Sequence, residues 1–295
     1  MDRLSKVPGK IGNSARKFFW IGVATLLGTV AMGSTSSFAQ GAGDLVVAPT
    51  RVVFDGRTRT AQLTLLNKGS ATATYRIAAV NMRMEEDGTV REIDKPDPGQ
   101  NFATGLFRYS PRQVTLKPGA AQAIRILLRK PKNLTDGEYR SHMLFRGVPD
   151  KAGESIEQTG AGDGISVKLI PIYGISIPII IRHGKTAADI SLSDLKLSAK
   201  DEANPLPRLN FKINRQGNKS AFGDLVATYK SGGNDVVIGQ IMRLAIYTPN
   251  TDRNVEMRLR VPDGVTLNGG KIHLTYSEIP DDGGKLMAQT DYAIP

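Results

Sequence analysis

The sequence contains no cysteine and only one tryptophan, and both scarcities narrow the possible functions. Without cysteine the chain has no disulfide, no thiolate metal ligand and no cysteine nucleophile. Such a chain must be held together by burial of apolar side chains, which two sandwich domains of this size can supply. The single tryptophan, Trp20, lies near the N-terminus, so the rest of the chain has no tryptophan platform for binding surface polymers.

Catalytic and ligand-binding motifs are also missing. His142, His183 and His273 lie far apart on different predicted elements, so a metal site is not expected. There is no GxxxxGK[ST] loop, no strand-coupled GxGxxG and no GxSxG frame. The acidic pairs Glu85–Glu86 and Asp281–Asp282 fall in predicted turns and are interpreted as solvated. We expect no enzyme, no cofactor and no small-molecule substrate.

The net charge of the chain is +11. Residues 1–39 hold five basic residues and one acidic residue, so residues 40–295 carry +7. These basic residues are scattered and match no RNA- or DNA-binding motif. The charge therefore indicates solubility and attraction to an acidic partner, and nucleic acid is not an expected partner.

The first 39 residues have the pattern of a signal peptide. A basic segment, residues 1–17, precedes an apolar run of sixteen residues, Phe18–Gly33, which is short for a membrane span. Ser37-Phe38-Ala39 then offers small residues at the −3 and −1 positions of a cleavage site before Gln40. The alternative is a retained N-terminal anchor. We predict an exported chain that begins at residue 40.

The rest of the sequence shows period-two alternation and no convincing helical period. Tyr75, Ile77 and Ala79 share one predicted strand face, for example, and turns such as Lys117-Pro118-Gly119 separate the segments. About seven short strands before residue 183 predict an immunoglobulin-like sandwich. A polar linker at residues 183–188 then precedes further short strands. The predicted fold is all-β, with domains at 40–182 and 183–295, the second smaller than the first.

One stretch, residues 165–182, has the longest alternation. The sequence ISVKLIPIYGISIPIIIR keeps one face apolar for eighteen residues and predicts a single long strand. It contains Pro171 and Pro178, which cannot donate to a ladder, so part of the strand is expected at a sheet edge, with a bulge or sheet switch near Gly174. The strand either pairs with another chain or is an ordinary core strand that crosses two sheets.

Four segments in order carry a resemblance to a known family. They are PTRVVFDG around Arg51, PRQVTLKPGAAQAIRI, DGEYRSHMLF and the long strand that ends in IIIR. Together they resemble periplasmic pilus-assembly chaperones of the PapD-like family, in its cysteine-free branch. The resemblance covers residues 45–182 well and the second half weakly. It implies two immunoglobulin-like domains in an L shape and a location in the periplasm.

The resemblance also implies how a partner is bound. Such chaperones donate the long strand to a pilus subunit that lacks its own last strand. The donated positions here would be Ile165, Val167 and Leu169, with Pro171 and Tyr173 less securely placed; the alternative is that they face the chaperone's own core. The subunit's C-terminal carboxylate would be held in the interdomain cleft by Arg51, since a guanidinium can bind a carboxylate through two parallel hydrogen bonds.

Two further features, an ion network and a missing lysine, follow from the family pattern. Glu138, Arg182 and Asp281 match a buried interdomain ion network that fixes the angle between domains. Where the family has a second cleft cation, a lysine, this chain has Pro178. Either a residue of the second domain supplies that charge, or Arg51 acts alone, or the client is not held by its terminus.

The favoured function is therefore a periplasmic chaperone for pilus or fimbrial subunits that donates residues 165–177. Its expected partners are a subunit and an outer-membrane usher, and the free protein could cap its own edge as a homodimer. The alternative is an exported β-sandwich adhesin or accessory binding module.

Overall fold

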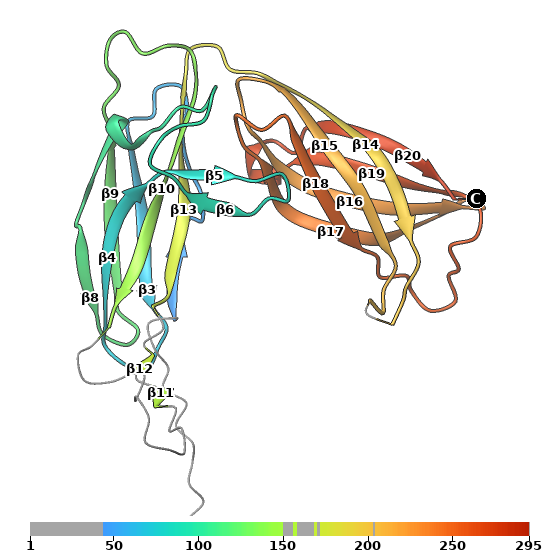
Figure 1. Cartoon of the computed structure of the whole chain (residues 1–295), viewed down its shortest axis with the longest axis horizontal. Helices are drawn as coiled ribbons and strands as arrows, with labels where there is room; N and C mark the ends of the chain where they lie inside the picture. The colour runs from blue at the N-terminus through green and yellow to red at the C-terminus, as the bar shows by residue number, and fades with distance from the viewer. Residues whose placement is uncertain (1–43, 150–155, 158–167, 170–171, 203, 295) are drawn as a thin grey trace, which may run out of the picture. The chain divides into compact units, whose positions relative to one another are not determined.

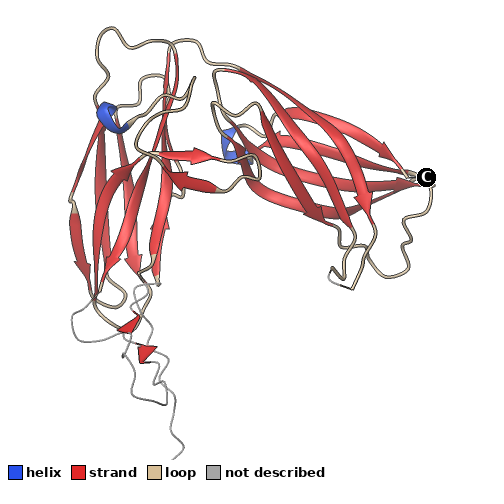
Figure 2. Cartoon of the chain, viewed as in Figure 1, coloured by secondary structure: helices blue, strands red, loops and turns tan. Residues whose placement is uncertain are grey.

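The computed structural model describes residues 44–149, 156–157, 168–169, 172–202 and 204–294. Regular structure in these residues consists of β-strands and two short 3-10 turns, which confirms the all-β prediction (Figures 1 and 2). No helix in the described ranges is long and apolar enough to cross a membrane. The predicted signal peptide lies outside these residues, and the described residues fall within one compact unit.

The first sandwich is built from two sheets. Residues 45–54 form two short strands that are separated at Pro49, and these two strands join different sheets. One sheet has the order β1-β3-β9-β7 and the other β2-β13-β10-β4-β8. Their bounds are β1 (Leu45–Ala48), β2 (Val52–Phe54), β3 (Thr60–Asn67), β4 (Ala73–Val80), β7 (Phe107–Ser110), β8 (Gln113–Leu116), β9 (Ala121–Leu128), β10 (Gly137–Val148) and β13 (Gly174–His183).

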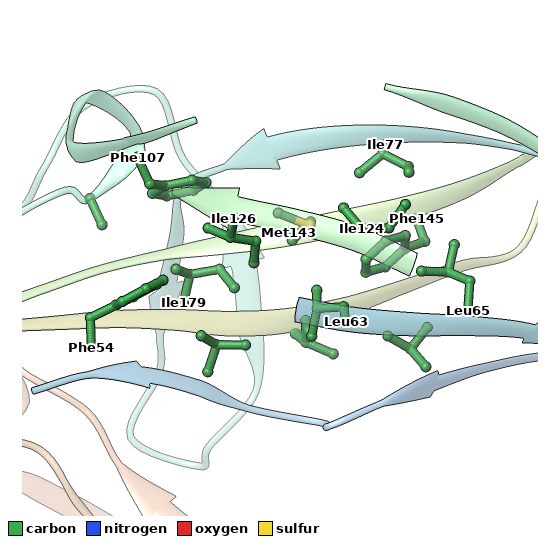
Figure 3. Close-up of a cluster of buried hydrophobic side chains, with 14 of the residues drawn as sticks. Phe54, Leu63, Leu65, Ile77, Phe107, Ile124, Ile126, Met143, Phe145 and Ile179 are labelled. Carbon is green, nitrogen blue, oxygen red and sulfur yellow. The ribbon is translucent and has the colours of Figure 1, made fainter. Parts of the chain in front are cut away.

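Period-two alternation explains the core of this sandwich. Tyr75 and Ile77 on β4 are buried, as are Ile124 and Ile126 on β9, while Arg125 between them is exposed. Figure 3 shows the side chains of both sheets meeting, with Met143 and Ile179 from one sheet beside Ile126 and Leu63 from the other. Each fully buried aliphatic or aromatic side chain contributes about 1.5–3 kcal/mol, so burial alone can hold a cysteine-free sandwich.

The predicted eighteen-residue strand is wrong in its length. The structure has two pieces: β12 (Lys168–Leu169), which pairs with β11 (Ile156–Glu157) in a separate two-stranded sheet, and β13, which begins at Gly174. Alternating hydrophobicity reports which face of a strand is apolar, and it does not report which neighbour the backbone bonds to. The strand is therefore divided although its apolar pattern is continuous.

β13 is paired unequally on its two sides. β10 pairs with it along its whole length, from Gly174 to His183. On the other side, the parallel strand β2 reaches only Ile179–Ile181. Residues 174–178 therefore have no ladder partner on that side within the part of the chain that the structure describes. Among the described residues, the half of β13 that precedes Ile179 is open on one side, in the region where the sequence predicted a sheet edge.

A hairpin of β5 (Met82–Met84) and β6 (Val90–Glu92) follows β4. The second sandwich has two sheets, in the orders β14-β15-β18 and β17-β16-β19-β20. Its strands are β14 (Ala188–Ser198), β15 (Arg208–Gly217), β16 (Ala221–Ser231), β17 (Asn234–Ile246), β18 (Asp252–Arg258), β19 (Lys271–Glu278) and β20 (Leu286–Ala293).

The second sandwich has its own core, which includes Leu209, Leu225 and Leu274. A small separate cluster joins β5 and β13 to the second sandwich through Met84, Ile180 and Tyr247. β13 ends at His183 and β14 starts at Ala188. The predicted linker at 183–188 coincides with this gap between strands, and the exact domain boundary stays a prediction.

Candidate functional site

Arg51 lies in the short connection between β1 and β2, where the chain passes from one sheet to the other. Its side chain is 11% exposed, and its NH1 group donates a hydrogen bond of 2.9 Å to Oδ2 of Asp282. The guanidinium carbon lies 4.3 Å from the centre of the Phe222 ring, and Nε is buried without a hydrogen-bond partner. Arg51 is therefore a nearly enclosed cation whose counter-charge comes from the second sandwich.

Glu138 and Arg182 face each other across the β10–β13 ladder, where they are register partners. Arg182 Nε donates to Glu138 Oε2 at 3.3 Å, and the Glu138 side chain is fully buried. The same oxygen accepts the Ser220 N–H at 3.2 Å, and Oε1 accepts the Ser220 hydroxyl. The buried carboxylate is thus satisfied from both sandwiches.

The third residue of this network is not Asp281, which the family pattern predicted. Arg182 NH1 contacts Asp55 Oδ2 at 3.4 Å, so Asp55 occupies the place predicted for Asp281. Asp281 is exposed on the turn η2 (Pro280–Asp282) and makes no ion pair with Arg182. Its neighbour Asp282 pairs with Arg51 instead. The physical reason is local: consecutive residues of a one-turn 3-10 helix point in different directions.

Arg140 and His142 continue the buried polar row that Glu138 begins on β10. Arg140 is 2% exposed and stacks on the Tyr247 ring at 4.3 Å, and two of its nitrogens, Nε and NH1, have no hydrogen-bond partner. Burial lowers the pKa of its guanidinium. Burial, helped by the nearby positive charge of Arg140, lowers the pKa of His142 to about 3. The histidine is therefore neutral at physiological pH.

Sequence reasoning did not identify this row. In the structure Tyr139, Met143 and Phe145 lie in the core, and Arg140 and His142 are on the opposite face of β10. That face is covered by residues such as Tyr247, which comes from another part of the chain. The one available signal was the charge density of the EYRSH stretch, which is high for a strand in the middle of a sheet.

Arg215, on β15, is a further buried cation that the sequence did not single out. It is 3% exposed, and burial lowers its pKa. Its guanidinium donates to four main-chain carbonyls, those of Gly217, Lys219, Pro249 and Asn250, at 2.7–3.3 Å. Together with Glu138 it lines a pocket of about 330 Å³. Because its donors bind backbone oxygens of two loops, Arg215 fixes the loops that form the pocket wall.

The residues predicted to bind a partner fall on the segment before β13. Ile165 and Val167 lie outside the described residues, and of Leu169 only the backbone, in β12, is described. Tyr173 is 55% exposed, as is Ile172, and the Tyr173 carbonyl accepts the Gly147 N–H at 3.0 Å. From Ile177 to Ile181 the odd-numbered isoleucines are buried in the sandwich's own core. Tyr173 therefore marks where this apolar face leaves the core.

Pro178 stands opposite His142 in the ladder, so no lysine occurs at the position where the family pattern expects one. The structure places Lys130 close to the end of β13, where its ammonium group donates to the Arg182 carbonyl at 2.6 Å. Burial lowers the pKa of Lys130. The charged residue of the second sandwich that pairs with Arg51 is an acid, Asp282, and not a second cation.

Comparison with known protein families gives a match over the first sandwich. Residues 44–182 match the family described as "Pili and flagellar-assembly chaperone, PapD N-terminal domain". No curated protein matches the chain. The resemblance that the sequence motifs indicated is confirmed over the range of this family match.

The chain is also similar to solved structures of chaperones. They include the Pseudomonas aeruginosa CupB2 chaperone, at 13% identity with 85% of this chain and 100% of that chain covered, and a TM-score of 0.41. The Escherichia coli chaperone DraB is 15% identical, with 85% of this chain and 96% of that chain covered, and a TM-score of 0.41. A chain of the complex of Salmonella enterica SafA pilin with the SafB chaperone is 14% identical, with 84% of this chain and 95% of that chain covered, and a TM-score of 0.37.

Proposed function

We propose that this chain, whose residues 44–182 match the PapD N-terminal domain family of pili and flagellar-assembly chaperones, is a periplasmic chaperone for a pilus or fimbrial subunit. It binds by adding a strand to the subunit. Its location follows from the predicted signal peptide, and its partners are the subunit and an outer-membrane usher. The proposed role is binding without catalysis, cofactor or metal.

The observation that carries the proposal is the open side of β13. Between Gly174 and Pro178 this strand has β10 on one side and no ladder partner on the other among the described residues. An unpaired strand edge is a template for pairing with another chain, through main-chain hydrogen bonds and alternate side chains. Exposed Ile172 and Tyr173 extend the apolar surface in the direction of the predicted donated segment.

Arg51 supports a second part of the proposal, which is that the subunit's terminal carboxylate is anchored beside β2. A partly enclosed guanidinium binds a carboxylate more strongly than a solvated one does, because fewer waters screen the charge. The proposed subunit-binding residues are Arg51, Ile165, Val167, Leu169 and Tyr173. The proposed role of Glu138 and Arg182 is to hold the two sandwiches in a fixed arrangement.

A pull-down from periplasm tests this function. We expect the wild-type protein to co-purify with a small β-rich subunit, and we expect Arg51→Ala and Val167→Asp to lose most of it. Loss of one buried aliphatic contact, with an acid in its place, costs about 2–3 kcal/mol, or roughly a 30- to 150-fold loss of affinity. The measurement is the amount of subunit per amount of bait.

Two variants serve as matched controls. Arg91→Ala removes an exposed arginine that pairs with Glu85, and Val237→Asp places an acid at an exposed valine of β17. Both should retain the subunit. Loss only with Val167→Asp would keep strand addition and remove the Arg51 anchor. Absence of any small partner in all lanes would contradict the chaperone proposal and favour an adhesin or accessory module.

A further inference from the structure

The proposed anchor, Arg51, already binds a carboxylate of its own chain. Its NH1 group donates to Asp282 at 2.9 Å, and Asp282 lies 231 residues further along, on the turn η2 after β19. The sequence pattern pointed to the neighbouring acid, Asp281, and assigned it to a different arginine. The contact between Arg51 and Asp282 is therefore a feature of this chain that the motif did not specify.

The guanidinium offers little room for a second carboxylate. A bidentate carboxylate needs two parallel N–H groups on one edge, either Nε with one terminal nitrogen or the two terminal nitrogens together. Nε is buried without a partner, and Phe222 lies against the planar face at 4.3 Å. The edge formed by the two terminal nitrogens includes NH1, which Asp282 occupies. An incoming carboxylate and Asp282 would use the same edge.

Asp282 can leave this position without unfolding its turn. Its side chain is 43% exposed, and its carboxylate has no other partner in the described part of the chain. The turn itself is held by main-chain hydrogen bonds, from the Asp282 N–H to the Ile279 carbonyl at 2.9 Å and from the Gly283 N–H to the Pro280 carbonyl at 3.1 Å. Rotation of the side chain into water therefore breaks one ion pair and leaves the backbone bonds intact.

We propose that Asp282 is an internal competitor for the client-binding cation: it occupies Arg51 in the free protein and is displaced by the terminal carboxylate of the client. This inference rests on the proposed function, because it takes Arg51 as the anchor. Asp282 keeps the nearly enclosed guanidinium paired when no client is present, and it lowers affinity for carboxylates that bring no further contacts. A client must add strand pairing to displace it.

The test compares Asp282→Asn with its neighbour Asp281→Asn, which removes an equal charge from the same turn without touching Arg51. The probe is an N-acetylated, lysine-capped peptide of alternating valine and threonine with a free C-terminal carboxylate, measured by calorimetry against the same peptide ending in a carboxamide. We expect Asp282→Asn to bind the carboxylate peptide about fivefold more tightly than wild type does, because the peptide no longer has to break a partly exposed ion pair of about 1 kcal/mol. Asp281→Asn should match wild type, and the carboxamide peptide should show no gain.

Three results would overturn parts of this scheme separately. If wild type prefers the carboxylate peptide but Asp282→Asn gains nothing over Asp281→Asn, the competitor is wrong and the anchor stands. If every variant binds both peptides equally, the anchor and the competitor are both wrong, while strand addition stands. If no peptide binds, strand addition to such clients is wrong, and a second measurement decides the role of Asp282.

That second measurement follows the Arg51 guanidinium by nitrogen NMR during titration with acetate, which needs no client strand. Assignment comes from the signal missing in Arg51→Ala. In the Asp282→Asn variant, Arg51 should respond at an acetate concentration about fivefold lower than in wild type or Asp281→Asn. Equal responses in all three proteins would show that Asp282 does not compete for this cation.

Discussion

Replacement of Glu138 by glutamine should lower the free energy of unfolding by about 3–5 kcal/mol. The side chain is fully buried, and its carboxylate accepts hydrogen bonds from Arg182 and from both the N–H and hydroxyl of Ser220. Glutamine keeps the size but loses the charge, so Arg182 keeps only the more exposed Asp55 as a counter-charge. Breaking a buried pair by removing one partner leaves an uncompensated charge, and this makes the loss large. Chemical denaturation followed by circular dichroism measures it.

Two aspartates give the matched controls for Glu138. Asp55→Asn removes the other carboxylate on Arg182, but the Asp55 side chain is 62% exposed, so the expected loss is at most about 1 kcal/mol. Asp281→Asn should leave stability unchanged within about 0.5 kcal/mol, because the residue is exposed and does not reach Arg182. If Asp281→Asn lost as much stability as Glu138→Gln, Asp281 would belong to the ion network with Arg182, as the family pattern predicted.

The Glu138 variant has a second expected signature. Ser220 and Arg182 belong to different sandwiches, and Glu138 bonds to both. Since each sandwich has its own core, loss of this link should separate their unfolding into two transitions in calorimetry. A single sharp transition in the variant, with unchanged midpoint, would contradict a role for Glu138 in joining them.

Alternation predicted the fold well because it directly reports which face of a strand is buried. It placed Tyr75, Ile77 and Ala79 on one strand face; the structure buries Tyr75 and Ile77 and packs the partly buried Ala79 against the same core. It failed for the stretch of residues 165–182, where it predicted one strand and the structure has β12 and β13 in different sheets. Pairing depends on backbone neighbours that come from distant parts of the chain, and a period-two pattern contains no information about them.

The candidate site was harder to predict for a related reason. The family resemblance pointed to Arg51, Glu138 and Arg182, but which acid meets which arginine depends on directions that differ between adjacent residues of a turn. As a result, Asp282 forms an ion pair with Arg51, and Asp55 forms one with Arg182. Likewise, alternation does not show what covers the polar face of β10, and it is the packing of Tyr247 that encloses Arg140.

The buried histidine of that face gives the second large prediction, which concerns pH. His142 has a pKa of about 3 in the folded protein, against about 6.5 in an unfolded chain, because burial and the charge of Arg140 disfavour its protonated form. Between these values the unfolded state binds a proton that the folded state does not. Stability is therefore fully present above pH 6.5 and is lost as pH falls toward 3, by as much as about 4–5 kcal/mol from this residue alone.

Two replacements of different polarity isolate this effect from the titration of carboxylates. His142→Gln and His142→Phe will differ in absolute stability, because one leaves an amide and the other a ring beside Tyr247. Both should nevertheless reduce the slope of unfolding free energy against pH, between pH 6 and pH 4, by up to about 1.4 kcal/mol per pH unit relative to wild type. Urea denaturation across this range gives the slopes. Parallel lines for all three proteins would mean that His142 is protonated with little cost in the fold, and that the packing of Arg140 and Tyr247 around it opens readily to water.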